Sequence, residues 1–266
     1  MMPLRIGFDM DGVLADFSQA FREVETRLFG RGEGLSADEP AREEEVQETK
    51  ARRSEDAALR KGAGAGPDAT GVEGSGGQKV PEPLEDIRVT KVTAGEGRRR
   101  RDLVWRDIQS TPNFWSTLKP MDENAVRRIH EMTLRHQWEV FFITQRPKTN
   151  GETVQRQTQR WLVDQGFDLP SVLVLAGSRG AAAGALRLDY HVDDSAQNCL
   201  DVTADSSARP ILIVPDTDAL SVLGARKLGI ATARSIEECL DILEEVAKVH
   251  TQPTLLQRLA ALVGWR

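Results

Sequence analysis

The sequence predicts an α/β protein built on a doubly wound parallel sheet, and two observations lead to this prediction. Short apolar runs typical of buried strands alternate along the chain with amphipathic stretches typical of helices. This alternation favours parallel strands joined by helices that cover both faces of the sheet. In addition, polar side chains follow several apolar runs directly, and ligands of doubly wound sheets bind beyond the carboxyl ends of the strands.

The predicted strands are short runs rich in Val, Ile, Leu and Phe. They cover residues 4–8, 140–143, 172–175, 190–192 and 211–214. The predicted helices carry apolar residues at helical spacing and lie between these runs. They cover 16–29, 122–136, 149–165, 180–188, 196–204 and 218–228. One more helix is expected over 235–248, where Ser235 and Glu238 have the spacing of a capping box.

The composition changes sharply after residue 30. Residues 31–85 combine mixed charges and a glycine-rich stretch with few large apolar side chains. So little apolar surface cannot offset the entropy lost when a backbone becomes ordered. We therefore expect a low-complexity, largely disordered insert at 31–85 and an α/β core formed by 1–16 and 116–250. The last segment, 251–266, has the pattern of an amphipathic helix with few basic residues, which favours a docked helix over a membrane anchor.

The bulk composition excludes several classes of protein. A net charge of −6 and a pI near 5.4 give no overall attraction to nucleic acid or anionic membranes. No apolar run approaches the roughly 20 residues of a membrane helix, and we expect no signal peptide. Cys199 and Cys239 lack metal-ligand spacing and do not suggest a disulfide framework. We expect a soluble cytoplasmic protein that binds neither nucleic acid nor membrane.

Candidate site residues follow four successive predicted strands, and parallel strands bring their carboxyl ends to one edge of the sheet. These residues are Asp9 and Asp11 after the first strand, Thr144, Gln145 and Arg146 after the second, Ser178 and Arg179 after the third, and Asp193 and Asp194 after the fourth. Two acids, a hydroxyl, a cation and two further acids suit phosphoryl transfer with Mg²⁺, which takes oxygen ligands.

In this hypothesis Asp9 attacks phosphorus and also binds Mg²⁺, because a carboxylate nucleophile divides hydrolysis into two easier steps. Asp11 protonates the leaving oxygen and later activates water. Thr144 and Arg179 hold the phosphoryl oxygens, and Gly12 lets the chain turn tightly after the strand. Asp193 and Asp194 complete the metal site, while Gln145 and Arg146 are expected to contact the substrate.

At these residues the chain resembles the haloacid dehalogenase (HAD) superfamily. Its members carry Asp-x-Asp-Gly, then Ser or Thr, then Lys or Arg, then an acidic pair at successive strand ends. The matching segments are DMDGV, FFITQR and GSRGAAAGALRLDYHVDDS. The stretches DMDGVLADF and FWSTLKPMDENAVRRIHEM are similar to the 5'(3')-deoxyribonucleotidase branch. The resemblance covers about 3–29 and 103–205, half of the chain.

The resemblance implies that Phe17 contacts a nucleoside, that Asp11 binds metal through its backbone, and that Asp194 is the direct ligand of the acidic pair. It also implies a small helical cap, formed by 17–30 and 86–115 and interrupted by the insert. The chain departs from this branch by carrying Arg179 where Lys is usual. Arg keeps the charge but is bulkier, and Arg187 is a second candidate for this cation.

Each candidate also has a structural explanation that the sequence leaves open, because Asp and Gly are common in turns and Asp often caps helices. The alternatives are turn carboxylates for Asp9 and Asp11, a helix N-cap for Asp193 and Asp194, a structural hydroxyl for Thr144, a solvated helix-start residue for Arg179, and core packing for Phe17. The histidines, His191 included, show no ligand spacing, and a structural role is expected for each.

The sequence thus predicts a Mg²⁺-dependent phosphomonoesterase that acts through an aspartyl-phosphate, most similar to a 5'-nucleotidase. The expected substrate is a small phosphorylated molecule, a nucleoside monophosphate first. Two alternatives come from other classes. One is a non-catalytic or regulatory protein of the same fold, and the other is an interaction scaffold that works through the insert and the C-terminal helix. The oligomeric state is open, with a homodimer as one option.

Overall fold

The computed structural model describes residues 3–30, 86–215 and 217–251. The predicted disordered insert at 31–85 lies outside the described residues, as does the predicted C-terminal helix from residue 252 onward. The chain divides into two compact units, Met1–Val24 with Val104–Arg266, and Glu25–Leu103.

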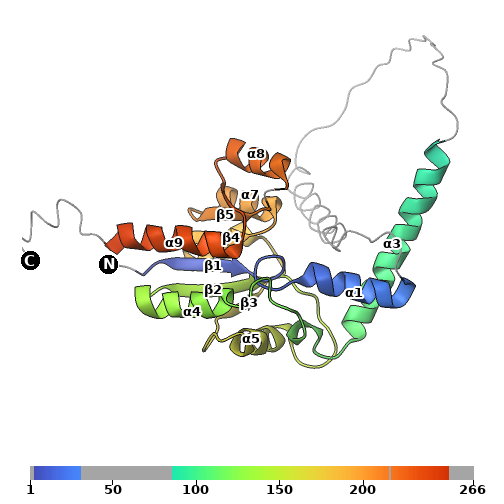
Figure 1. Ribbon diagram of the computed structural model, residues 1–266, viewed down its shortest axis with the longest axis horizontal. Coiled ribbons are helices and arrows are strands. Elements are labelled where there is room, and N and C mark those ends of the chain that lie inside the picture. The colour runs from blue at the N-terminus through green and yellow to red at the C-terminus, as the bar shows by residue number, and fades with distance from the viewer. Residues whose placement is uncertain (1–2, 31–85, 216, 252–266) are drawn as a thin grey trace, which may run out of the picture. The chain divides into compact units, whose positions relative to one another are not determined.

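In its described part, the larger unit contains a six-stranded parallel sheet with the strand order β3-β2-β1-β4-β5-β6 (Figure 1). The predicted doubly wound α/β class is therefore confirmed. The strands are β1 (Arg5–Asp9), β2 (Glu139–Thr144), β3 (Val172–Val174), β4 (Tyr190–Asp193), β5 (Arg209–Ile213) and β6 (Ala231–Ala233).

The strand order reverses beside β1, which pairs with β2 on one side and with β4 on the other. Phe8 of β1 lies opposite Phe142 of β2 and Val192 of β4. The gap between β1 and β4 is the topological switch point, where doubly wound sheets bind ligands beyond the strand ends. Asp9 and Asp193 are the last residues of these two strands, so the fold brings them to the switch point.

Helices connect the strands and cover the sheet. Helix α4 packs against α9, and α6 packs against α7. Right-handed crossovers place α4 and α5 on one face of the sheet and α6, α7 and α8 on the other. The helices are α1 (Phe17–Phe29), α3 (Asp86–Ser110), η1 (Phe114–Ser116), α4 (Ala125–His136), α5 (Val154–Asp164), α6 (Arg179–Leu186), α7 (Ala196–Asp205), α8 (Ala219–Lys227) and α9 (Ile236–Thr251).

The core lies between the sheet and these helices. One cluster packs β2 against α6 and α7 and consists of Ile143, Ala183, Leu188, Val202 and Ala208. A second cluster surrounds the buried Cys199 and packs α7 and α8 against β5; its other members are Leu212, Val214, Ala225 and Ile230. Both cysteines are buried as free thiols, and burial raises the pKa of Cys239 to about 12.

The structure differs locally from the sequence prediction, and three of the differences have a clear physical reason. Strand β6 was not predicted, because Ala231–Ala233 is short and lacks large apolar residues. Helix α5 begins at Val154 instead of residue 149, since the Thr153 side chain caps it by accepting from Arg156 N. At the predicted capping box, Ser235 Oγ accepts from Glu238 N at 3.3 Å, but the Glu238 carboxylate accepts from Arg234 N at 2.6 Å instead of from Ser235.

The smaller unit contains the end of α1 and the beginning of α3. Here the Arg100 guanidinium lies 4.7 Å from the centre of the Phe29 ring, and Arg100 Nη2 lies 3.9 Å from Glu25 Oε1. The predicted cap at 17–30 and 86–115 includes these helices, and its role as a cap stays a prediction.

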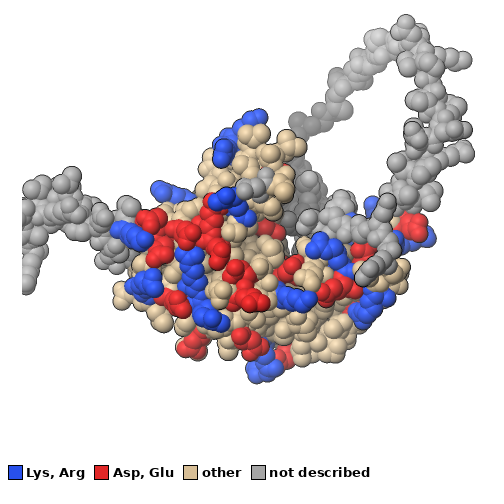
Figure 2. Space-filling view, in the orientation of Figure 1, with Lys and Arg blue, Asp and Glu red and all other residues tan. Residues whose placement is uncertain are grey.

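The surface of the larger unit carries charges of both signs. On the face drawn in Figure 2, acidic and basic side chains are interspersed. Some form ion pairs between α4 and α9, where Arg128 Nη2 lies 3.5 Å from Glu244 Oε2 and Arg135 Nη1 lies 3.3 Å from Glu244 Oε1. Among the described helices, none combines the length and the apolar character needed to span a membrane.

Candidate active site

The turn after β1 presents the first acidic pair. Asp9 is buried, and its Oδ2 accepts from Asp11 N at 3.1 Å. Gly12 has a φ of +82°, and a Cβ at this position would overlap the carboxylate of Asp194. Glycine is therefore required here for two reasons, a left-handed backbone and the close approach of a side chain from the loop after β4.

Arg179 extends from the first turn of α6 to both acids at the switch point. Its Nη2 donates to Asp9 Oδ1, and its Nε lies 3.6 Å from Asp193 Oδ2. The side chain is 4% exposed, and its Nε and Nη1 have no hydrogen-bond partner among the described residues. The solvated alternative for Arg179 is therefore wrong. Arg187, the second candidate cation, is exposed at the end of α6.

Asp193 is fully buried and held by a set of donors that includes a histidine. Its Oδ1 accepts from Ser195 N at 2.9 Å, and the Asn198 side-chain amide donates to both oxygens at 2.9 and 3.0 Å. His191 Nε2 lies 3.0 Å from Asp193 Oδ2. The N-cap of α7 is Ser195, so the N-cap alternative for the acidic pair is wrong.

His191 and Asn198 were missed as site residues by the sequence analysis. A signal for His191 was present, because residues two apart in a strand point to the same face and His191 precedes Asp193 by two. Asn198 lies three residues after Ser195, the N-cap of α7, and so within the first turn of that helix. This spacing indicates a site residue only when the position of the N-cap is known.

The two buried carboxylates have opposite pKa shifts. Burial raises the pKa of Asp9 well above its usual value, Arg179 opposes this rise, and the charges of Asp193, Asp194 and Asp11 add to it. For Asp193 burial also acts to raise the pKa, but the His191 contact, the charge of Arg179 and the Ser195 backbone hydrogen bond outweigh it and hold the pKa below its usual value. Titratable groups whose environments push their pKa values apart are typical of active sites.

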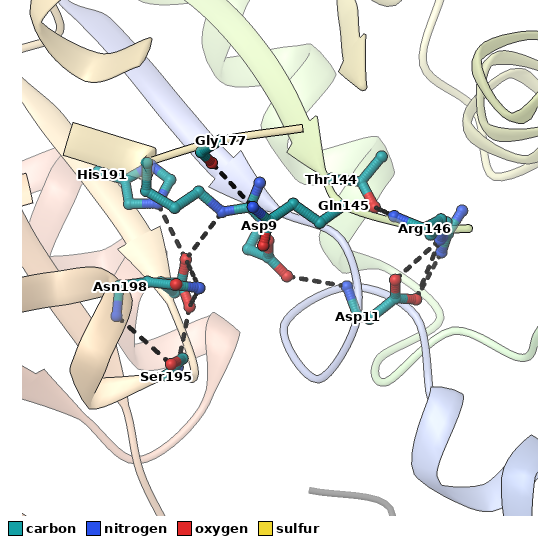
Figure 3. A network of polar contacts seen from close by, with 11 residues as sticks. Asp9, Asp11, Thr144, Gln145, Arg146, Gly177, His191, Ser195 and Asn198 are labelled. Atoms are coloured by element: carbon teal, nitrogen blue, oxygen red, sulfur yellow. Dashed lines mark hydrogen bonds and ion pairs between the residues drawn. The ribbon is translucent and has the colours of Figure 1, made fainter. Parts of the chain in front are cut away.

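The end of β2 contributes a buried hydroxyl and two polar neighbours. Thr144 is 1% exposed, and its Oγ1 accepts from Arg146 N at 3.3 Å, which leaves the hydroxyl proton to donate. Gln145 Nε2 donates to Gly177 O at 2.8 Å and so ties this loop to the loop before α6. The structure brings Thr144 and Gln145 to the same edge of the sheet as the acids (Figure 3).

Arg146, predicted to contact the substrate, forms a two-pronged contact with Asp11. Its Nε lies 3.1 and 2.9 Å from the two carboxylate oxygens of Asp11, and its Nη2 lies 2.7 Å from Oδ1. The Asp11 carboxylate points toward Arg146 and away from Asp9 in Figure 3. Asp11 is thus ion-paired with Arg146 of the loop after β2. It is not merely an exposed carboxylate of a turn, which was the alternative that the sequence left open.

Phe17 lies in an aromatic cluster at the start of α1. Its ring centre is 5.4 Å from that of Trp105 in a stacked arrangement and 5.6 Å from that of Trp115. Phe21 approaches Phe17 edge-on at 5.8 Å. Phe17 is half-buried, and these ring contacts give it a packing role.

The donor set at the switch point fits Mg²⁺ in kind. Asp9 and Asp194 provide carboxylates beside one turn, and Asp194 is exposed. Within the described residues, no three acidic, histidine or cysteine side chains are gathered into a complete metal site. Mg²⁺ usually takes one or two protein carboxylates and fills its remaining positions with water and substrate phosphate.

No family model and no curated protein sequence matches the chain. Solved structures that match include HAD-superfamily hydrolases. A phosphonoacetaldehyde hydrolase-like protein from Oleispira antarctica is 11% identical with a TM-score of 0.48, over 92% of this chain and 93% of that chain. A HAD hydrolase of family IA, variant 3, from Entamoeba histolytica is 15% identical with a TM-score of 0.43, over 89% and 95%.

A 2-haloacid dehalogenase from Pseudomonas syringae is also similar, at 15% identity and a TM-score of 0.38, over 92% of this chain and 99% of that chain. Likeness at this level does not identify a reaction.

Proposed function

We propose that the chain is a HAD-type phosphomonoesterase that requires a divalent cation, Mg²⁺ first, and acts through a phosphorylated aspartate. One observation carries this proposal: an acid, a hydroxyl and a second acid at the ends of β1, β2 and β4 converge with Arg179 from α6 at the switch point. Arg179 is buried between two carboxylates with its Nε and Nη1 donors open, and buried donors of this kind favour a bound anion as their partner.

Asp9 is the proposed nucleophile. A carboxylate oxygen of Asp9 forms a bond to phosphorus while the bond between phosphorus and the leaving oxygen breaks, and the leaving oxygen takes the electron pair of that bond. The open Nε and Nη1 donors of Arg179 and the Thr144 hydroxyl then hold the phosphoryl oxygens. When bound by Asp9, Asp194 and the Asp11 carbonyl, Mg²⁺ supplies positive charge that offsets repulsion between the carboxylates and the phosphate.

Asp11 is the proposed acid and base. Its carboxyl group donates a proton to the leaving oxygen and then, as a carboxylate, takes a proton from the water that hydrolyses the aspartyl-phosphate. The products are an alcohol and inorganic phosphate, and Asp9 returns to its starting state. A nucleoside monophosphate is the substrate class to test first, because the half-buried Phe17 begins the helix that follows the Asp9–Asp11 turn.

The test measures phosphate release from 4-nitrophenyl phosphate and from nucleoside monophosphates, with Mg²⁺ and with EDTA. We expect turnover that requires Mg²⁺ and that is abolished by Asp9→Asn. As a matched control, Asp168→Asn removes an exposed carboxylate outside the site and is expected to leave turnover unchanged. Turnover that survives Asp9→Asn, or none in the unaltered chain, would favour a regulatory protein or a scaffold instead.

A further inference from the structure

We infer that Arg146 is a positioning residue that fixes the carboxylate of Asp11 for proton transfer to the leaving group. The inference rests on the proposed function, since it assigns Asp11 an acid role. It differs from the substrate contact that the sequence suggests for Arg146, because the structure directs the guanidinium to Asp11.

Contacts with neighbouring side chains fix the guanidinium of Arg146, in addition to its ion pair with Asp11. Its side chain is fully buried, and Nη1 donates to Thr158 Oγ1 of α5 at 3.0 Å. The guanidinium carbon lies 5.0 Å from the centre of the Trp115 ring, within the range of a cation–π contact. Trp115 is itself fixed, because its indole N–H donates to Pro147 O at 2.9 Å. These contacts therefore hold the guanidinium in one orientation. An arginine that only closes on a bound substrate would not need to be fixed in this way.

The loop that carries Arg146 is stabilised by a buried glutamine. Gln157 accepts from Trp115 N at 3.0 Å and donates to Thr149 Oγ1 at 3.0 Å and to Glu152 O at 2.6 Å. Gln157 is fully buried, so these contacts are made without competition from water. Helix α5 and η1 thus hold the loop after β2 as a rigid support for Arg146.

Arg146 restrains Asp11 without occupying all of it. Asp11 Oδ1 accepts two hydrogen bonds from the guanidinium and Oδ2 accepts one. Each carboxylate oxygen has two lone pairs, so one position on Oδ2 remains for a proton. The Asp11 side chain is 25% exposed, whereas that of Arg146 is fully buried, so water or a substrate can reach Asp11 but not Arg146. A fixed plane with one open position suits a group that delivers a proton along one direction.

This assignment predicts a dependence on the leaving group. A poorly positioned acid slows the release of a basic leaving oxygen, which needs a proton, much more than the release of a weakly basic one. General acid catalysis contributes about 10²–10⁴-fold. Arg146→Lys keeps the charge but loses the two-pronged contact with Asp11. We expect this variant to lower kcat/KM for phenyl phosphate by about 10–100-fold and for 2,4-dinitrophenyl phosphate by less than about 3-fold.

The experiment compares kcat/KM for both esters in the unaltered chain, Arg146→Lys, Thr158→Val and Asp11→Asn. Thr158→Val removes the hydroxyl that orients Arg146 while keeping its shape, so it tests the inference even if Arg146 variants fail to fold. It is expected to shift the ratio of the two esters in the same direction by a smaller factor. Arg156→Gln is the matched control, because Arg156 is an exposed arginine of α5 that pairs with Glu152.

The outcomes separate this inference from the proposed function. A selective loss on phenyl phosphate in Arg146→Lys, matching the selectivity of Asp11→Asn, supports the inference. An equal loss on both esters, or a rise in KM alone, would assign Arg146 to substrate binding or folding and overturn it while the phosphatase proposal stands. No turnover in the unaltered chain overturns the proposed function, and the inference with it.

Discussion

At the residue scale, the site is built from carboxylates that the fold treats differently. Asp193 has three donors besides Arg179 and a lowered pKa, whereas Asp9 is buried with Arg179 as its cationic partner and has a raised pKa. A nucleophile must keep its lone pairs for phosphorus, so we expect Asp9 to have fewer stabilising partners than Asp193 and to lower the stability of the fold. This asymmetry leads to a measurable effect on stability.

Asp9→Asn should stabilise the protein at neutral pH in EDTA. Because the folded pKa of Asp9 is raised, its protonated form contributes stability that is complete below the ordinary pKa of 3.8 and is lost as pH rises through the folded pKa. Asparagine keeps the shape and carries no charge, so it avoids this loss. We expect the melting temperature to rise by about 2–4 °C at pH 7, equivalent to about 1 kcal/mol.

The difference should shrink as pH approaches the ordinary pKa of aspartate, where Asp9 is neutral in both states. Thermal unfolding of both chains in EDTA across this range provides the measurement. A variant that melts lower than the unaltered chain at pH 7 would show that the Arg179 contact outweighs burial and the like charges at Asp9.

At the element scale, the contact between α6 and α7 determines where Arg179 lies. A Cβ on Gly180 would overlap the backbone oxygen of Asp201 and lie 2.7 Å from its carbonyl carbon. Backbone atoms cannot move aside as a flexible side chain can, so the first turn of α6 approaches α7 only with glycine at this position. Arg179 precedes Gly180 and begins the same helix.

Gly180→Ala should therefore separate α6 from α7 and withdraw Arg179 from Asp9. Overpacking of this kind costs about 1–3 kcal/mol. We expect lower stability in chemical denaturation and a loss of turnover larger than the loss of folded protein explains. Gly224→Ala in α8 is the control, because nothing lies within 4 Å of its Cβ position and it should gain about 0.5–1 kcal/mol. Full activity in folded Gly180→Ala would show that the contact between α6 and α7 does not determine the position of Arg179.

The elements also show what the sequence alone could predict. Strands β1, β2 and β4 were predictable because each is a buried apolar run that ends in polar residues, and this pattern located Asp9, Thr144 and Asp193 together. Strand β6 was not, because three small residues carry no periodic signal. The Arg146–Asp11 contact joins residues 135 positions apart and depends on Trp115 and Thr158, a combination that no local pattern contains.

At the scale of the whole molecule, the sheet gathers negative charge at one edge, and a cation should therefore stabilise the folded chain. In the unfolded chain the Asp9 and Asp194 carboxylates are far apart, so Mg²⁺ has little affinity for that state. A ligand that binds the folded state alone adds about 2.7 kcal/mol at a concentration 100 times its Kd. We expect Mg²⁺ to raise the melting temperature of the full chain above its value in EDTA.

Asp194→Asn should abolish most of this rise, because the exposed carboxylate beside Gly12 is a proposed direct ligand, whereas Asp168→Asn should leave the rise intact. The measurement needs no substrate and is independent of turnover. An equal rise in all three chains would show that Mg²⁺ acts on the general surface charge. An absent rise in the unaltered chain would remove the metal from the site and leave Arg179, Arg146 and the donors around Asp193 to offset the charge of the carboxylates.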